Sequence, residues 1–254
     1  MTTQPTYHPL LAAAPVVRAI LDGRQTQDRR PILIRQGHSR VLPQYAGFFE
    51  EDGSLYVEDH YGDTRSIADF APWQPGDILY VRETWRVAAW RSDEWKVACD
   101  YKASPEETHT PWIYLPHGTY DEVEHRQLQE LQSLGVEPDN DGHYRWEHGK
   151  APVKWRPSIH MPRWAARIFL EVVSVRAERL QDISEEDAIA EGIQKSIGGM
   201  WCGAPHKAHG APRQHNSARE AFADLWNSLY SNRPGQDWSA NPWVWATTFN
   251  RVQP

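Results

Sequence analysis

The chain lacks the features that would place it outside the cell or in a membrane. It has only two cysteines, Cys99 and Cys202, which are too few for a disulfide framework and favour a reducing compartment. No apolar run approaches the roughly 20 residues of a membrane span. Residues 1–10 also lack the basic and apolar regions of a signal peptide. These absences predict a cytoplasmic protein with no membrane partner.

Positive charge is also scarce. Lys and Arg together number 27 against 34 Asp and Glu, which gives a formal net charge of −7. Affinity for duplex DNA regardless of sequence comes mainly from basic side chains that neutralise phosphates, so a protein that coats duplex DNA is not expected. A small pocket for a single base remains compatible with this charge.

Tryptophan and proline, in contrast, are abundant, with 13 and 19 residues. An indole has a large apolar face and one hydrogen-bond donor, so it suits half-buried sheet positions as well as the wall of a site for a flat ligand. We expect packing to account for most of the tryptophans and ligand contact for a few.

The hydrophobic pattern predicts a mixed α+β fold. Apolar residues at helical spacing predict helices near residues 15–22, 184–192 and 217–230. Runs of β-branched and aromatic residues predict strands at 78–83, 95–101, 165–175 and 243–249. Polar or Gly- and Pro-rich stretches at about 36–72, 104–152 and 196–215 are interpreted as insertions into a single domain of residues 1–254, with 54–58 as one hairpin arm and 123–134 as a helical patch.

Five segments of the chain resemble, in order, those of ASCH-domain proteins of the PUA-like superfamily. They are residues 23–30 (GRQTQDRR), 75–85 (PGDILYVRETW), 155–165 (WRPSIHMPRWA), 180–193 (LQDISEEDAIAEGI) and 241–245 (NPWVW). The third and fifth segments are similar to phage and prophage members in particular. The resemblance implies a PUA-like (ASCH) β-barrel with flanking helices and a long polar insertion, enclosing a polar cleft for RNA or modified nucleosides.

The resemblance also identifies candidate catalytic positions. A small bacterial relative hydrolyses the amide of acetylated cytidine with a lysine, a threonine and a glutamate, and these positions correspond to Gln25, Asp28 and Glu191. Gln25 cannot supply an ammonium group and Asp28 has no hydroxyl nucleophile, so the threonine mechanism does not transfer. An Asp28–Glu191 pair could still activate water, which keeps hydrolysis open as an alternative.

The loop at 24–30 holds most of the predicted ligand-binding residues. These are Arg24, Gln25, Arg29 and Arg30. Arginine is a forked donor that suits phosphates and base edges, and the resemblance places this loop at the cleft. The alternatives are a salt-bridged surface loop, in which Asp28 neutralises a neighbouring arginine, and an ordinary solvated charge for Glu191.

Two further segments contain ligand-binding candidates. Glu83 could pair with the exocyclic amine of a base while Trp85 stacks on its ring, although a solvated acid and a rim tryptophan explain the same residues. In segment 155–164 cations and flat rings alternate, which favours single-stranded nucleic acid and marks Arg156, Ser158 and His160. The alternative is that this segment closes one end of the barrel.

A metal site is not predicted. Cys202, His206, His209 and His215 have the composition of a zinc site, but three, two and five residues separate them, which fits no common zinc module. We expect a loop there, and neither a metal nor a cofactor.

The sequence therefore predicts an ASCH-type binding protein for RNA or modified nucleosides. Two alternatives remain open at this point. One is a hydrolase that acts on a modified nucleobase, an amide or a phosphodiester, and the other is a protein-interaction module in phage development that works in the host cytoplasm. The sequence leaves the ligand and the oligomeric state undetermined.

Overall fold

The computed structural model describes residues 4–36, 39–41, 48–58, 63–103, 111–147, 149–205 and 210–253. These residues form several β-sheets and four α-helices, which confirms the predicted α+β class. None of these helices is both long and apolar enough to cross a membrane. The chain divides into two compact units, unit 1 (Met1–His8, Ala19–Ile78 and Leu170–Val252) and unit 2 (Pro9–Arg18, Leu79–Phe169 and Gln253–Pro254).

The central strands of unit 1 are three neighbours in one sheet, in the order β12 (Phe169–Arg179), β15 (Trp243–Val252) and β2 (Gln27–Pro31). β2 pairs antiparallel with β15 and places Arg29 opposite Ala246. Along β2 the burial alternates, since Gln27 and Arg29 are buried whereas Asp28 and Arg30 are half-buried. The two sets of polar side chains therefore leave this strand on opposite faces.

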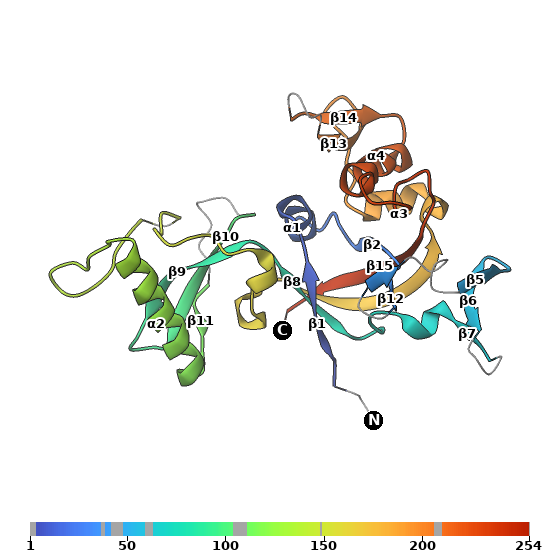
Figure 1. The fold of residues 1–254 in the computed structure, drawn as a ribbon. Coiled ribbons are helices and arrows are strands. Elements are labelled where there is room, and N and C mark those ends of the chain that lie inside the picture. Colours follow the sequence, from blue (N-terminus) through green and yellow to red (C-terminus); the bar gives the residue numbers. More distant parts are fainter. Residues whose placement is uncertain are drawn as a thin grey trace. The chain divides into compact units, whose positions relative to one another are not determined.

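The helices of unit 1 lie side by side next to this sheet (Figure 1). They are α3 (Glu185–Ala190) and α4 (Ala218–Tyr230), and serine caps both, since Ser184 and Ser217 each accept a backbone N–H from the residue three positions later. The hairpin of β13 (Trp201–Pro205) and β14 (Pro212–His215) contacts α4. A hydrophobic core that includes Ile183 and Phe222 joins α3 to α4.

The remaining strands of unit 1 form two small sheets. They are β3 (Ile34–Gln36) with β4 (Ser39–Val41), and β5 (Phe48–Glu51), β6 (Ser54–Glu58) and β7 (Thr64–Ser66). The predicted hairpin arm at 54–58 is confirmed and is the middle strand of its sheet. Its Leu55 packs in a core with Ile32, Ile67 and two tryptophans of β15, Trp243 and Trp245.

Unit 2 is a helix packed on an antiparallel sheet (Figure 1). The sheet has three strands, β9 (Trp85–Arg91), β10 (Lys96–Tyr101) and β11 (Ile113–Tyr114), in the order β11, β10, β9. Strand β8 (Ile78–Arg82) belongs to another sheet, in which it pairs with β1 and β12. The helix is α2 (His117–Ser133), which buries Tyr120 and Leu131. The chain passes from one unit to the other within β1 (Tyr7–Leu11) and α1 (Ala14–Leu21).

Most predicted elements are confirmed, with several differences. The predicted loop at 24–30 includes most of strand β2, and the predicted loop at 196–215 includes the hairpin of β13 and β14. The predicted strand at 165–175 begins later, because residues 163–165 form a 3₁₀ turn that Ala165 N–H closes onto the carbonyl of Pro162 at 3.1 Å. Strand β9 was not predicted, since its centre is alanine-rich and lacks the β-branched residues that mark strands. β10 and β15 lie in different sheets, so the structure does not confirm that the predicted strands share one barrel. The single barrel stays a prediction.

Candidate functional site

The loop at 24–30 and the end of α3 are adjacent in unit 1. Gln25 forms an antiparallel bridge with Glu191, and Thr26 N–H donates to the carbonyl of Ala190 at 2.8 Å. Arg24 donates to the carbonyl of Gly192 at 3.3 Å. Gly192 has φ +92°, and a Cβ there would lie 3.4 Å from Gln25, so glycine allows this close approach. The backbone therefore fixes Glu191 beside the loop that the sequence identified.

Arg29 organises the carboxylates at this junction. Its side chain is 0% exposed and donates to Glu178 of β12 at 2.7 Å, to Asp187 of α3 at 2.9 Å and to Glu191 at 2.8 Å. The fourth partner is the side-chain oxygen of Gln27, at 2.9 Å. The expectation that Arg29 contacts a ligand is therefore wrong, because burial on the inner face of β2 commits its guanidinium to these partners.

The Glu191 carboxyl is held in an environment that favours its protonated form. Burial, and then the negative charge of Asp28, raise the pKa of Glu191 to about 8, although Arg29 opposes the shift. Asp28 leaves β2 on the face opposite to Arg29 and accepts a hydrogen bond from Arg30 Nε at 2.5 Å. The raised pKa means that the Glu191 carboxyl can donate a hydrogen bond at neutral pH.

Tyr230, the last residue of α4, completes the group. Burial and the charge of Asp28 raise the pKa of Tyr230. The sequence analysis did not select it, although its position four residues after Trp226 on an amphipathic helix was a usable signal, and the two rings stack at 4.4 Å between centroids. We call Asp28, Arg30, Glu191 and Tyr230 the Asp28–Glu191 cluster.

The Asp28–Glu191 cluster is partly open to solvent. The side chain of Arg30 is 38% exposed and that of Asp28 is 16% exposed, whereas that of Glu191 is only 6% exposed. A carboxyl group whose pKa is strongly raised by burial and by a neighbouring charge is a common feature of sites that move a proton or recognise a polar edge. The cluster offers an acceptor, a donor and a cation within one small region.

The predicted Glu83 contact is wrong, because Glu83 is buried in unit 2. It is 1% exposed and forms a two-bond ion pair with Arg167, at 2.8 Å from Nε and 3.0 Å from Nη2. Burial raises the pKa of Glu83, and the contact with Arg167 opposes that shift. Its carboxylate is therefore already paired and cannot reach the amine of a base.

Trp85 is likewise not a stacking surface. It is 3% exposed and packs in a core with Met161 and Ala165, while Trp164 meets it edge-on at 5.5 Å between ring centroids. Because Trp85 begins strand β9 on the side that faces this core, no ring face is left for a ligand. The predicted base-stacking role of Trp85 is therefore wrong.

Arg156 and His160 line a groove of ≈ 690 Å³ in unit 2. The backbone of Arg156 is bonded to that of Trp85 in both directions, at 2.7 Å and 3.2 Å. Ser158 is half-buried and begins the 3₁₀ turn Ser158–His160. Of the three candidates in this segment, Arg156 and His160 are therefore placed where a ligand can reach them.

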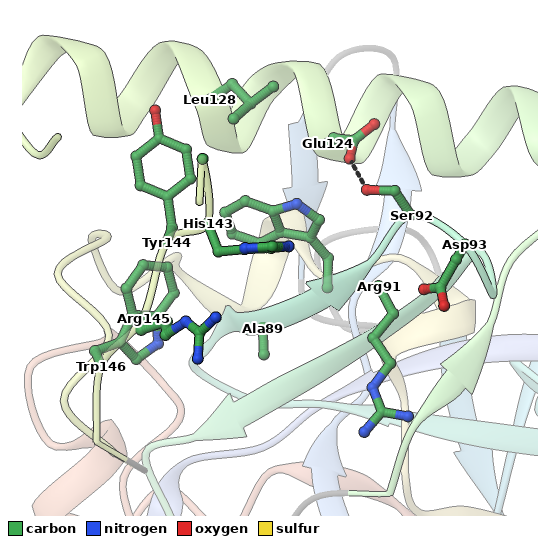
Figure 2. Close-up of a pocket in the computed structure, with 12 residues that line it drawn as sticks. Ala89, Arg91, Ser92, Asp93, Glu124, Leu128, His143, Tyr144, Arg145 and Trp146 are labelled. Carbon is green, nitrogen blue, oxygen red and sulfur yellow. Dashed lines mark hydrogen bonds between the residues drawn. The ribbon is translucent and has the colours of Figure 1, made fainter. Parts of the chain in front are cut away.

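A larger pocket of ≈ 980 Å³ in unit 2 contains none of the predicted residues (Figure 2). It is bounded by the end of β9, by α2 and by residues 142–146, and its aromatic side chains are Trp90, Tyr144 and Trp146. The ring of Trp90 lies 6.1 Å from that of Tyr144 and 5.9 Å from that of Trp146, between centroids. Residues 142–146 were interpreted as part of the polar insertion at 104–152. Their aromatic side chains were a signal that the sequence analysis did not use.

Two groups of residues have the composition of a metal site. Asp139, Asp141 and His143 are exposed, and their ligand atoms lie within 4.8 Å of one another, although Asp139 also pairs with Arg145 at 2.7 Å. Of the His/Cys group considered above, Cys202 lies in β13 and His215 in β14. His206 and His209 lie outside the described residues.

Comparisons of this chain with protein-family models, with curated proteins and with solved structures give no match.

Proposed function

We propose that this chain is an ASCH-type protein with a PUA-like barrel that binds RNA or a modified nucleoside, and that the base contacts the Asp28–Glu191 cluster. The observation that supports the binding site is the buried Glu191 carboxyl, whose pKa is raised to about 8 by burial and by the charge of Asp28. The barrel and the ligand class rest on the resemblance of the five sequence segments.

The cluster matches the needs of a base edge, which presents donors and acceptors side by side. A carboxyl oxygen of Asp28 accepts a hydrogen bond from an exocyclic amine, and protonated Glu191 donates to a ring nitrogen or a carbonyl. Half-exposed Arg30 supplies a cation for a phosphate or a carbonyl oxygen. Arg29 holds Glu191 in place and does not touch the ligand in this proposal.

Identification of the ligand comes first in the test. Mass spectrometry of nucleosides and RNA that copurify with the protein selects the candidates, and calorimetric titration measures their affinity. Asp28→Asn should weaken the binding of the selected nucleoside about tenfold or more, since one charge-assisted hydrogen bond contributes roughly 1.5–3 kcal/mol. Glu186→Gln, an exposed residue on the same helix as Glu191, is the matched control and should bind like the wild type.

The pH dependence of binding gives a second readout. Above a pH of about 8 Glu191 ionises and can no longer donate, so wild-type affinity should fall there. Glu191→Gln retains a donor in its amide and should bind equally well at pH 6 and pH 9. Affinity for every nucleoside that is unchanged in both Asp28→Asn and Glu191→Gln, at both pH values, would rule out this site.

The same pair of acids supports a second candidate function, a hydrolase. Asp28 would remove a proton from water, whose oxygen attacks the amide carbonyl carbon of an acylated base. The C–N bond then breaks, and Glu191 supplies the proton that the leaving amine needs. The raised pKa of Glu191, which keeps a proton on this carboxyl at neutral pH, favours this alternative.

Turnover distinguishes the hydrolase from the binding protein. Incubation with an N4-acylated cytidine, followed by chromatography, should release cytidine and the acid if the alternative holds. Asp28→Asn and Glu191→Gln should then abolish turnover but still bind the substrate. Binding without any turnover by the wild type removes the hydrolase and leaves the first proposal standing.

A further inference from the structure

The groove in unit 2 lies between one face of α2 and the chain at 155–160. Its residues on α2 are three or four positions apart, as neighbours on one helical face must be. They are Arg126, Gln129, Glu130 and Ser133, and the facing residues are Trp155, Arg156, Pro157 and His160.

Hydrogen bonds hold the two walls of the groove together. Glu130 accepts the backbone N–H of Lys154 at 2.7 Å with one oxygen, and the guanidinium of Arg156 at 3.3 Å with the other. The backbone of Arg156 is also bonded to Trp85 at the start of β9. The groove is therefore formed before any ligand arrives, which lowers the entropy cost of binding.

The groove has an excess of positive charge. Its one acid, Glu130, is already engaged by Lys154 and Arg156. Arg126 is exposed, and among the residues that the structure describes it has no hydrogen-bond or ion-pair partner; His160 is exposed as well. In a chain with a net charge of −7, such a local surplus favours an anionic ligand, and a guanidinium fits the oxygens of a phosphate.

Trp155 adds an aromatic surface to this charge. It is 37% exposed and lines the groove, while the guanidinium of Arg86 lies 4.4 Å from the centre of its ring. Arg86 is itself buried and bonded to Asp100 at 3.0 Å, so it supports one face of the indole from the protein side. The part of Trp155 that lines the groove is left for a second flat partner, such as a base.

We infer that this groove binds nucleotide units of single-stranded RNA, with phosphates on Arg126 and Arg156 and a base against Trp155. Stacking tolerates any base, so the groove contributes affinity rather than sequence preference. The inference rests on the proposed function for its ligand class. It adds a second binding site, in unit 2, and its ligand is an RNA strand rather than a free nucleoside.

The test is the fluorescence anisotropy of a labelled oligouridine RNA over a series of salt concentrations. Arg126→Ala and Arg126→Glu change an exposed side chain and should leave the fold intact. Arg126→Ala should weaken RNA binding about fivefold or more, and it should lower the salt slope by about 0.7 for each phosphate that is no longer neutralised. Trp155→Ala should also weaken binding about fivefold or more, with the salt slope unchanged.

Two variants serve as controls. Arg65→Ala removes an exposed arginine of unit 1 and should bind RNA like the wild type. Arg126→Glu lies outside the Asp28–Glu191 cluster and should bind the selected nucleoside like the wild type in calorimetric titration, so failure of the nucleoside site and failure of the groove are distinguishable.

Three outcomes would overturn the inference. The first is RNA affinity that is unchanged in both Arg126→Glu and Trp155→Ala. The second is a wild-type protein that binds no oligouridine, whatever the nucleoside titrations show. The third is AMP that competes as strongly per molecule as the oligonucleotide, which would assign the groove to a free nucleotide.

Discussion

Arg29 is the buried cation of the candidate site and contacts Glu178, Asp187 and Glu191. Arg176 also pairs with Glu178 at 3.3 Å and with Asp187 at 3.6 Å, and Arg30 pairs with Asp28, so three guanidinium groups face four carboxyl groups. Glu191 is the most buried of these acids, and its pKa is raised to about 8. The consequence of this imbalance is a stability that depends on pH.

The first prediction concerns that dependence. The pKa of Glu191 rises from 4.5 to about 8 on folding, so between these values the folded state holds a proton that the unfolded state has lost. The free energy of unfolding therefore declines as pH rises through this window. Relative to Glu191→Gln, the wild type should lose roughly 1 kcal/mol or more between pH 5 and pH 8, because one pKa unit is about 1.4 kcal/mol.

Urea denaturation at a series of pH values measures this difference. Glu186→Gln, which changes an exposed acid of the same helix, should follow the wild-type curve. Parallel curves for the wild type and Glu191→Gln would contradict the raised pKa.

The second prediction concerns the buried pair of Glu83 and Arg167 in unit 2. Arg167→Ala leaves a carboxylate in the core without a cation and should cost about 3–5 kcal/mol of unfolding free energy. The exposed pair of Arg91 and Glu94 is the comparison, and Arg91→Ala should cost under about 1 kcal/mol. Glu83→Gln combined with Arg167→Ala should recover part of the loss; a double variant no more stable than Arg167→Ala would show that the charge is not the cause.

At the level of elements, α3 and α4 are joined by a shared cap. Glu185, the first residue of α3, accepts the backbone N–H groups of Ala218 at 2.8 Å and of Arg219 at 3.3 Å. Ser217 accepts that of Glu220 at 3.1 Å. The free N–H groups at the start of α4 therefore depend on a side chain from the helix that leads to Glu191.

The third prediction follows from this cap. Glu185→Ala should destabilise unit 1 by about 1–2 kcal/mol, and Ser217→Ala by about 1 kcal/mol. Thermal unfolding measures both, with Glu186→Ala as the control that removes a charge from the same turn and leaves the cap in place. Equal melting temperatures for Glu185→Ala and Glu186→Ala would show that the cap adds nothing.

The elements that the sequence predicted best are those whose burial follows a simple period. α4 was found because Phe222 and Trp226 repeat at helical spacing. β2 was missed because residues 27–31 are almost entirely polar, and strand preference depends on the neighbours that a strand meets in the fold. Had β2 been recognised, its period of two would have separated Arg29 on the inner face from Asp28 and Arg30 on the outer face.

The candidate site was predicted in part. The resemblance brought Gln25, Asp28 and Glu191 together, and no local pattern could have done so across such a separation in sequence. Glu83 and Trp85 were wrong because a strand end looks the same in sequence whether its side chains point to solvent or to a core. That distinction depends on Arg167 and Met161, which follow far along the chain.

At the level of the whole molecule, the segments interpreted as insertions hold much of the structure. Residues 104–152 contribute α2 and the aromatic side chains Tyr144 and Trp146 of the larger pocket (Figure 2). Residues 36–72 contribute a three-stranded sheet with Leu55 in a core. The polar composition of these two segments did not indicate this structure, because each segment buries only a few large side chains.

The two cysteines differ in burial, so thiol labelling can distinguish the two units. Cys99 is 0% exposed in the core of unit 2, where burial and the charge of Asp100 raise its pKa to about 12, so its reactive thiolate is scarce. Cys202 is half-exposed in unit 1. Under native conditions a maleimide should therefore attach once, at Cys202, as intact mass and peptide mapping would show.

The rate of the second attachment, at Cys99, then reports on unit 2 alone. Cys99 can react only when the β9–β10 sheet opens, so the rate of double labelling measures that opening while Cys202 is already blocked. Equal labelling rates at both thiols would contradict the buried position of Cys99. Without any substitution, therefore, Cys202 allows unit 1 to be labelled at a single site, and the labelling rate of Cys99 measures the opening of unit 2.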